Sequence, residues 1–151
     1  MSANEAGSSS DGGSHQRDPL YLIGVGASAG GLQALEEFFS AVAANDEAAY
    51  VVAQHLAPSH PSLLVDLLAR SSPLPVAQAQ DGVNLRGGVI FVAPPDSDVF
   101  VEGDVMRVVE PPERFGSSPS IDRLFESLAS NWGIDRLPSS CRELDRTGPW
   151  A

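Results

Sequence analysis

Short apolar runs alternate with amphipathic segments along the middle of this chain, and this alternation constrains the fold more than any other feature. Three continuous apolar runs are typical of strands covered on both faces: Leu20–Val25, Tyr50–Ala53 and Val89–Ala93. Three segments carry apolar residues at helical spacing: Gly30–Ala44, Ser62–Arg70 and Ser120–Trp132. Two valine-rich runs flank "EGD" and predict a hairpin: Val99–Val101 and Val105–Val109. The order of these elements predicts an α/β fold with a mainly parallel sheet flanked by helices.

The helical spacing also predicts which side chains face the core. In the first helix these are Leu32, Leu35, Phe38, Phe39 and Val42. In the second they are Leu63, Leu64, Leu67 and Leu68. In the third they are Ile121, Leu124, Phe125 and Leu128. Each helix is therefore expected to bury one face against its neighbours.

Composition argues against several classes of function. The formal net charge is −11, and arginine supplies every fixed positive charge because the chain contains no lysine. Binding to nucleic acid or to an anionic lipid surface needs a basic face, so neither partner is expected. The single cysteine, Cys141, leaves no internal disulfide and argues against a thiolate metal site. Because no leader pattern and no apolar run of membrane-spanning length is present, we expect a cytoplasmic protein that does not insert into membranes.

The turn after the first apolar run carries the first functional signal. Gly26-Ala27-Ser28-Ala29-Gly30 fits the pattern G-x-S-x-G between a predicted strand and a predicted helix. In that context a serine projects from a tight turn as a nucleophile, and the N-terminus of the following helix favours negative charge nearby. Ser28 is therefore a candidate nucleophile.

A dinucleotide site is the alternative interpretation of the same turn. Gly24, Gly26 and Gly30 form G-x-G-x-x-x-G, a loose variant of the pyrophosphate-binding fingerprint. That fingerprint expects an acidic residue at the end of the second strand, where this sequence has Gln54 and His55. The missing acid argues against a dinucleotide.

His55 is the candidate base for Ser28. Adjacent strands of an open α/β sheet place their carboxyl ends at one edge, so the two residues are expected to meet there. A serine needs such a base to become a nucleophile. On the residues alone, a loop-facing imidazole without a chemical role is an open alternative for His55. His60, in a predicted loop, and His15, near the N-terminus, are weaker candidates.

Four motifs in order carry a resemblance to a known family. They are "IGVGASAGGLQAL", "VVAQHL", "AQDGVNLRGGVIFVAPP" and "PSIDRLFESLA". Over about Leu20 to Gly133 the chain resembles the catalytic domain of the chemotaxis protein-glutamate methylesterases. The resemblance implies a Rossmann-like fold of the methylesterase type, incomplete at its C-terminus. The short segment before it is similar to the start of methylesterase/methyltransferase fusions.

The resemblance also implies an activity, which is hydrolysis of glutamyl methyl esters on chemoreceptors; some members also deamidate receptor glutamines. Ser28 takes the position of the family's nucleophile and His55 that of its general base. Ala29 follows the serine, and its backbone N–H is expected to stabilise the oxyanion. The implied partners are methylated chemoreceptor helices, and no cofactor and no metal are expected.

The family's third catalytic residue, an aspartate in a loop of the form SGxGxDG, has no counterpart in this sequence. Asp135 and Asp145 are the only aspartates after Gly133, and neither matches that motif, so both are expected to be solvated. With one permitted choice of synonymous codons, Arg136 to Ala151 in a frame shifted by two bases reads PAVVLSGTGSDGALG. This is an apolar strand followed by the aspartate loop. We therefore expect a frameshift near Asp135 and an impaired enzyme, because loss of the aspartate costs up to about 10⁴-fold in other triads.

Three parts are expected along the chain. Residues 1–18, rich in Ser, Gly and Asp, form a disordered lead-in; residues 19–135 form the N-terminal part of the catalytic domain; residues 136–151 form an out-of-frame tail. A non-catalytic, receptor-binding remnant of the family is the alternative to an enzyme. Asp122 and Arg123 are expected to cap or cover the last predicted helix.

Overall fold

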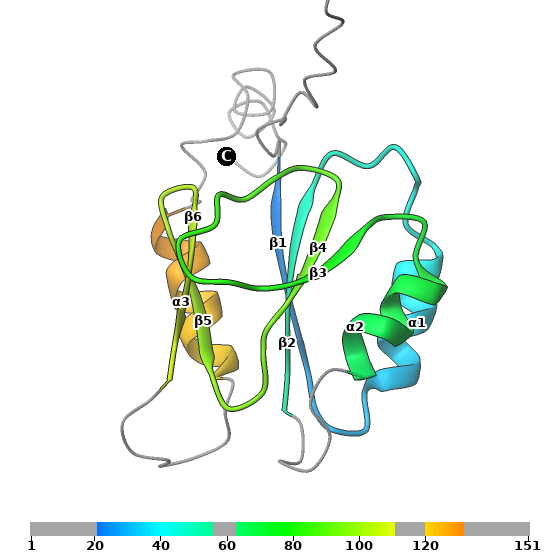
Figure 1. Ribbon diagram of the computed structural model, residues 1–151, viewed down its shortest axis with the longest axis horizontal. Coiled ribbons are helices and arrows are strands. Elements are labelled where there is room, and N and C mark those ends of the chain that lie inside the picture. Colours follow the sequence, from blue (N-terminus) through cyan, green and yellow to red (C-terminus); the bar gives the residue numbers. More distant parts are fainter. Residues whose placement is uncertain (1–20, 56–62, 111–119, 132–151) are drawn as a thin grey trace, which may run out of the picture.

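A four-stranded parallel sheet lies at the centre of the fold (Figure 1). The computed structural model describes residues 21–55, 63–110 and 120–131. The strands are arranged in the order β1-β2-β4-β3, with bounds Leu22–Ala27 (β1), Ala49–Gln54 (β2), Val76–Gln78 (β3) and Val89–Val92 (β4). The predicted lead-in and tail, together with His15, His60, Asp135 and Asp145, lie outside the described residues. The predicted α/β class with a mainly parallel sheet is confirmed.

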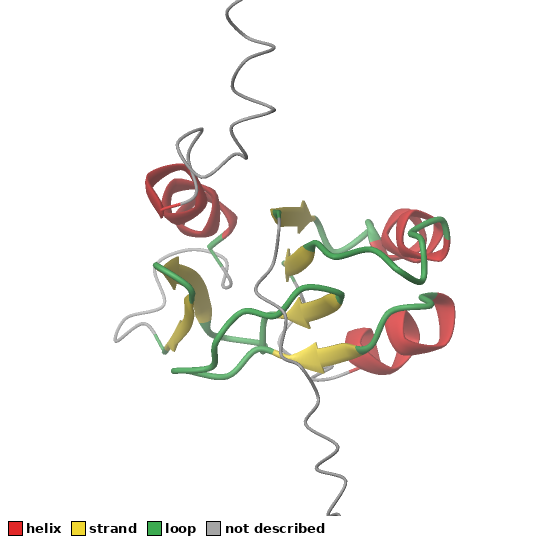
Figure 2. Cartoon of the chain, turned by 90° about the horizontal axis from the view of Figure 1, so that it is seen from above, coloured by secondary structure: helices red, strands yellow, loops and turns green. Residues whose placement is uncertain are grey.

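Strand β2 is buried on both faces and divides the core into two clusters. Tyr50 and Val52 belong to the cluster on the side of helices α1 (Leu32–Ser40) and α2 (Leu63–Ser71). Val51 and Ala53 belong to the cluster on the opposite side. There the sheet meets helix α3 (Ile121–Asn131) and a hairpin formed by β5 (Asp98–Glu102) and β6 (Val105–Val109), as Figure 2 shows. The continuous apolar runs of the sequence therefore reflect burial on both faces of the sheet.

Parts of the sequence prediction are wrong or incomplete. Strand β3 was not expected, because three residues are too few to show a period, yet it pairs with β4 at the edge of the sheet. Phe38, Leu63 and Phe125 were expected in the core but are 47%, 54% and 43% exposed. In these helices, the surface that contacts the rest of the core is narrower than the row of apolar side chains predicted from the helical spacing. At the margin of this surface, the Phe38 ring packs edge-on against Phe39, with ring centroids 5.0 Å apart.

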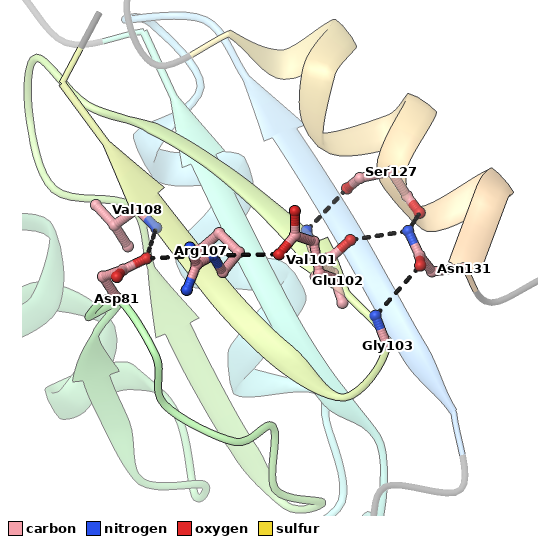
Figure 3. Close-up of polar contacts among 8 residues, drawn as sticks. All are labelled: Asp81, Val101, Glu102, Gly103, Arg107, Val108, Ser127 and Asn131. Carbon is pink, nitrogen blue, oxygen red and sulfur yellow. Dashed lines mark hydrogen bonds and ion pairs between the residues drawn. The ribbon is translucent and has the colours of Figure 1, made fainter.

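Helix α3 covers the outer edge of strand β5, as shown in Figure 3. The Val101 N–H donates to Ser127 Oγ (3.0 Å) and the Gly103 N–H donates to Asn131 Oδ1 (3.2 Å). Asn131 Nδ2 in turn donates to the Val101 carbonyl oxygen (2.8 Å). An isolated two-stranded hairpin is only marginally stable, and the backbone N–H and C=O groups at its edges are unpaired. Side chains of α3 form hydrogen bonds with these groups of β5, where a third strand would otherwise pair. On its other side the hairpin carries an exposed pair between Arg107 and Asp81, also drawn in Figure 3.

The two glycines of strand β1 allow α3 to approach the sheet. A Cβ atom at Gly26 would lie 2.6 Å from Ile121 Cγ2, and one at Gly24 would clash with Leu128 Cδ1. Both glycines are paired inside the strand, Gly24 with Val51 and Gly26 with Ala53. Gly24 and Gly26 are thus required for helix–sheet packing.

We expect the substitution Gly26→Val to destabilise the fold by about 1–3 kcal/mol, because overpacking forces the α3 side chains away from the sheet. Urea unfolding followed by circular dichroism measures this change in the free energy of unfolding. Gly30→Ala is the matched control, since a Cβ there meets nothing within 4 Å, and it should change stability by less than about 1 kcal/mol. Equal stabilities of the two variants would show that α3 does not pack on β1.

Candidate active site

Ser28 and His55 each follow a strand end at the carboxyl edge of the sheet. The last residues of β1 and β2, Ala27 and Gln54, are partners in the parallel register. The His55 N–H extends this ladder by donating to the Ala27 carbonyl oxygen (3.0 Å). Ser28 and His55 therefore occupy the next position on neighbouring strands, whose backbones lie about 4.8 Å apart in a sheet. Ser28 is exposed and His55 is half-buried.

The backbone of the Ser28 turn is held from two directions. The Ser28 carbonyl oxygen accepts a hydrogen bond from the Gly31 N–H (2.9 Å), which closes the turn before α1. The same oxygen accepts a second bond from Gln54 Nε2 (3.1 Å). Gln54 is only 3% exposed, so this contact is sheltered from water. Sequence reasoning missed Gln54 as a site residue, although a polar residue ending a buried strand is a usable signal.

The turn differs from a strained nucleophile elbow in one respect. Among the residues that the structure describes, Asp96 is the only non-glycine residue with a positive φ (58°), so Ser28 does not have the left-handed backbone. The hydrogen bond to Gly31 closes a turn without that strain. No hydrogen bond joins Ser28 Oγ to His55 within the described residues, and such bonds are often loose before substrate binds.

The dinucleotide interpretation is not supported by the position of the glycines. Its fingerprint needs glycines in the turn, where the backbone approaches a pyrophosphate. Gly24 and Gly26 instead lie within β1, beneath the side chains of α3. At both positions the side of the strand on which a Cβ would lie is occupied by α3 side chains.

Asp98 organises the start of α3 near the same edge of the molecule. Its carboxylate accepts hydrogen bonds from the Ser120 N–H (2.9 Å) and from Arg123 Nη1 (3.2 Å). The Arg123 guanidinium also lies 4.3 Å from the centre of the Phe100 ring. The cap of α3 is Ser120, whose Oγ accepts a hydrogen bond from the Arg123 N–H (3.3 Å), and Asp122 is exposed in the first turn.

Replacing Asp98 by Ala should lower the free energy of unfolding by about 1–2 kcal/mol, because the acceptor of the Ser120 N–H and the partner of Arg123 are lost together. Most of this effect comes from the Ser120 N–H, which is left without its acceptor, since Arg123 is half-exposed and solvent screens its ion pair. The control Asp122→Ala should change stability by about 0.5 kcal/mol or less. Chemical denaturation of the two variants tests the expectation, and a neutral Asp98→Ala would contradict it.

Tyr50 is the titratable residue whose environment is most clearly perturbed. Burial raises its pKa above the usual value of 10.0, and the hydrogen bond to Asp46 and the charge of Asp46 raise it further. The hydroxyl donates to Asp46 Oδ2 over 3.1 Å near the amino end of β2. Because Ser28 and His55 lie at the opposite end of the strands, this pair is structural.

Within the described ranges, the structure has no cluster of three or more His, Cys, Asp or Glu side chains suited to a metal ion. In the same ranges no helix is both long and apolar enough to cross a membrane.

Comparisons with known proteins agree with the fold and the motifs. The family described as CheB methylesterase matches residues 23–137. A "Protein-glutamate methylesterase/protein-glutamine glutaminase 1" of Saccharophagus degradans is 36% identical over 114 residues, which are 74% of this chain and 31% of that protein. A "Protein-glutamate methylesterase/protein-glutamine glutaminase 2" of Methanosarcina acetivorans is 32% identical over 123 residues, covering 76% of this chain and 35% of that protein. The chain thus spans about a third of the length of these relatives.

The solved catalytic domain of the Thermotoga maritima CheB methylesterase has the same fold, with a TM-score of 0.63 and 24% identity. The alignment covers 73% of this chain and 60% of that domain.

The fold and the candidate site place the chain in the class of open parallel α/β domains whose functional residues follow the carboxyl ends of the strands. Within this class, the chain belongs to the CheB methylesterase family.

Proposed function

We propose that this chain carries the nucleophile and base of a protein-glutamate methylesterase, with Ser28 and His55 in these two roles. The observation that carries the proposal is their shared position, one residue beyond paired strand ends at the carboxyl edge of the sheet. Family membership and the names of the relatives support the reaction class. Methylated glutamates on chemoreceptor helices are the proposed substrates, with receptor glutamines as a second substrate class and the cytoplasm as the place of action.

The proposed reaction is a two-step acyl transfer. His55 accepts the proton of Ser28 Oγ as that oxygen attacks the ester carbonyl carbon. The resulting oxyanion is stabilised by the Ala29 N–H and by the N-terminus of α1, which has no acidic residue in its first turn. The C–O bond to the methoxy group then breaks, and His55 returns the proton so that methanol leaves. His55 then takes a proton from water as the water oxygen attacks the acyl carbon. The bond from that carbon to Ser28 Oγ breaks, and His55 returns the proton to Ser28 as glutamate leaves.

Methanol release from a methylated chemoreceptor fragment tests this function. We expect the parent chain to release methanol, and we expect this release to stop when Ser28 is replaced. Binding of the fragment without methanol release and without reaction of Ser28 with a fluorophosphonate would instead identify a non-catalytic, receptor-binding remnant. That outcome would overturn the proposal.

The acid of the triad belongs to the proposal as well. We assign residues 136–151 to a shifted reading frame, because an SGTGSDG loop is obtainable from that stretch by synonymous codons alone. In this proposal residues 19–135 are the N-terminal part of the catalytic domain and residues 1–18 precede it. The chain as written then acts slowly, since His55 lacks the carboxylate that would orient it.

A further inference from the structure

Gln54 is a buried amide placed directly before the candidate base and against the candidate nucleophile. It ends strand β2, is 3% exposed, and donates from Nε2 to the Ser28 carbonyl oxygen over 3.1 Å. We infer that Gln54 is a positioning residue, which holds the Ser28–Ala29 peptide so that the Ala29 N–H points at the substrate oxyanion. This inference rests on the proposed function of Ser28.

The geometry of one peptide unit connects Gln54 to the oxyanion. A trans peptide is planar, so the Ser28 carbonyl and the Ala29 N–H point in opposite directions. Two donors, Gln54 Nε2 and the Gly31 N–H, hold the carbonyl oxygen on the protein side. The Ala29 N–H must then face away from these donors.

The Ala29 N–H is available for a ligand. Within the part of the chain that the structure describes, it donates no hydrogen bond, and Ala29 is exposed. A free, fixed N–H beside a nucleophile is the arrangement that stabilises an oxyanion without reorganisation during the reaction. Rotation of the peptide would break both hydrogen bonds of the Ser28 carbonyl, so Gln54 opposes that rotation.

Gln54→Met tests the role, because it preserves the approximate size of the side chain and removes the donor. The measurement is the rate of Ser28 phosphonylation by a fluorophosphonate in the full chain, followed by intact mass. We expect the saturating rate to fall by about 10–100-fold, less than the 10²–10³-fold typical for complete loss of an oxyanion donor. The concentration for half-saturation should change little. Gln80→Met, the same change at an exposed glutamine, should label at the parent rate.

Gln54→Glu separates hydrogen bonding from packing. A carboxylate repels the Ser28 carbonyl oxygen, whereas a protonated carboxyl group donates to it as the amide does. The labelling rate of this variant, divided by the parent rate at the same pH, should therefore rise as the pH falls from 8 to 5. Division by the parent rate removes the contribution of His55 titration. A purely structural role for Gln54 predicts that this ratio, once divided by the folded fraction of the variant at each pH, is independent of pH.

The outcomes distinguish this inference from the proposed function. Slow labelling of Gln54→Met with a pH-dependent ratio for Gln54→Glu supports the positioning role. Parent-like labelling of Gln54→Met, or a flat ratio for Gln54→Glu, overturns it while Ser28 stays the nucleophile. If Gln54→Met fails to fold, the pH dependence of the labelling-rate ratio for Gln54→Glu decides between the positioning role and a purely structural role. Absence of labelling at Ser28 in the parent chain overturns the proposed function and the inference together.

Discussion

Replacing Ser28 by Ala is expected to abolish covalent labelling of this chain by a fluorophosphonate. The reagent reacts readily only with a serine whose proton can pass to a base, and the fold places His55 at the matching position on the neighbouring strand. Mass spectrometry of the parent chain should find the adduct on the peptide that contains Ser28. In the Ser28→Ala chain the adduct should be undetectable.

The control for this experiment is a serine outside the site. Ser40 ends helix α1, is exposed, and has its hydroxyl bonded to the Glu37 carbonyl oxygen, so Ser40→Ala should label at the parent rate. His55→Gln should suppress labelling almost as completely as Ser28→Ala, because serine and base act as one unit. Adduct formation that persists in Ser28→Ala would assign the reactive group elsewhere and contradict the proposed nucleophile.

Correcting the proposed frameshift near Asp135 is expected to give the second large effect, an increase in esterase rate of up to about 10⁴-fold. The restored aspartate would orient His55 and stabilise its imidazolium, which is the contribution lost when the acid of a serine triad is removed. The shifted reading also contains an apolar run before the loop. Within the described residues β1 is an edge strand with a partner on one side only, so a further parallel strand has a place to pair. Its loop would then lie at the edge that holds Ser28.

The experiment compares the chain as written with a gene corrected in this segment, using methanol release from a glutamyl methyl ester. The matched control is a corrected chain whose restored loop carries asparagine in place of aspartate. Its rate of methanol release should equal that of the chain as written. Sequencing of the DNA from the codon of Trp132 onward provides an independent check. DNA that encodes no shifted SGxGxDG reading would refute the frameshift, and an uncorrected chain with the full rate would show that the acid comes from elsewhere.

The succession of strands and helices, apart from β3, was predictable from the sequence because each of the other elements carries its own period. Strand β2 is a continuous apolar run since both of its faces are buried, and α1, α2 and α3 show helical spacing. The shared edge of Ser28 and His55 followed from the rule that parallel strands end together, and the register confirms that the strands they follow are neighbours. The catalytic roles of the two residues stay predictions.

Contacts between distant segments were not predictable, because they depend on which surfaces the folded chain brings together. Local sequence predicts a phosphate loop or a nucleophile turn equally well from the glycines, whereas the tertiary structure shows that Gly24 and Gly26 admit helix α3. Gln54 gave no periodic signal, and its hydrogen bond to the Ser28 carbonyl oxygen is visible only in the tertiary structure. The sequence by itself determined the α/β order and the edge at which the candidate residues lie, since hydrophobic period and strand direction are local properties. Only the tertiary structure decided which small residues serve packing and which polar group bonds to the turn, because these depend on side chains far apart in the chain.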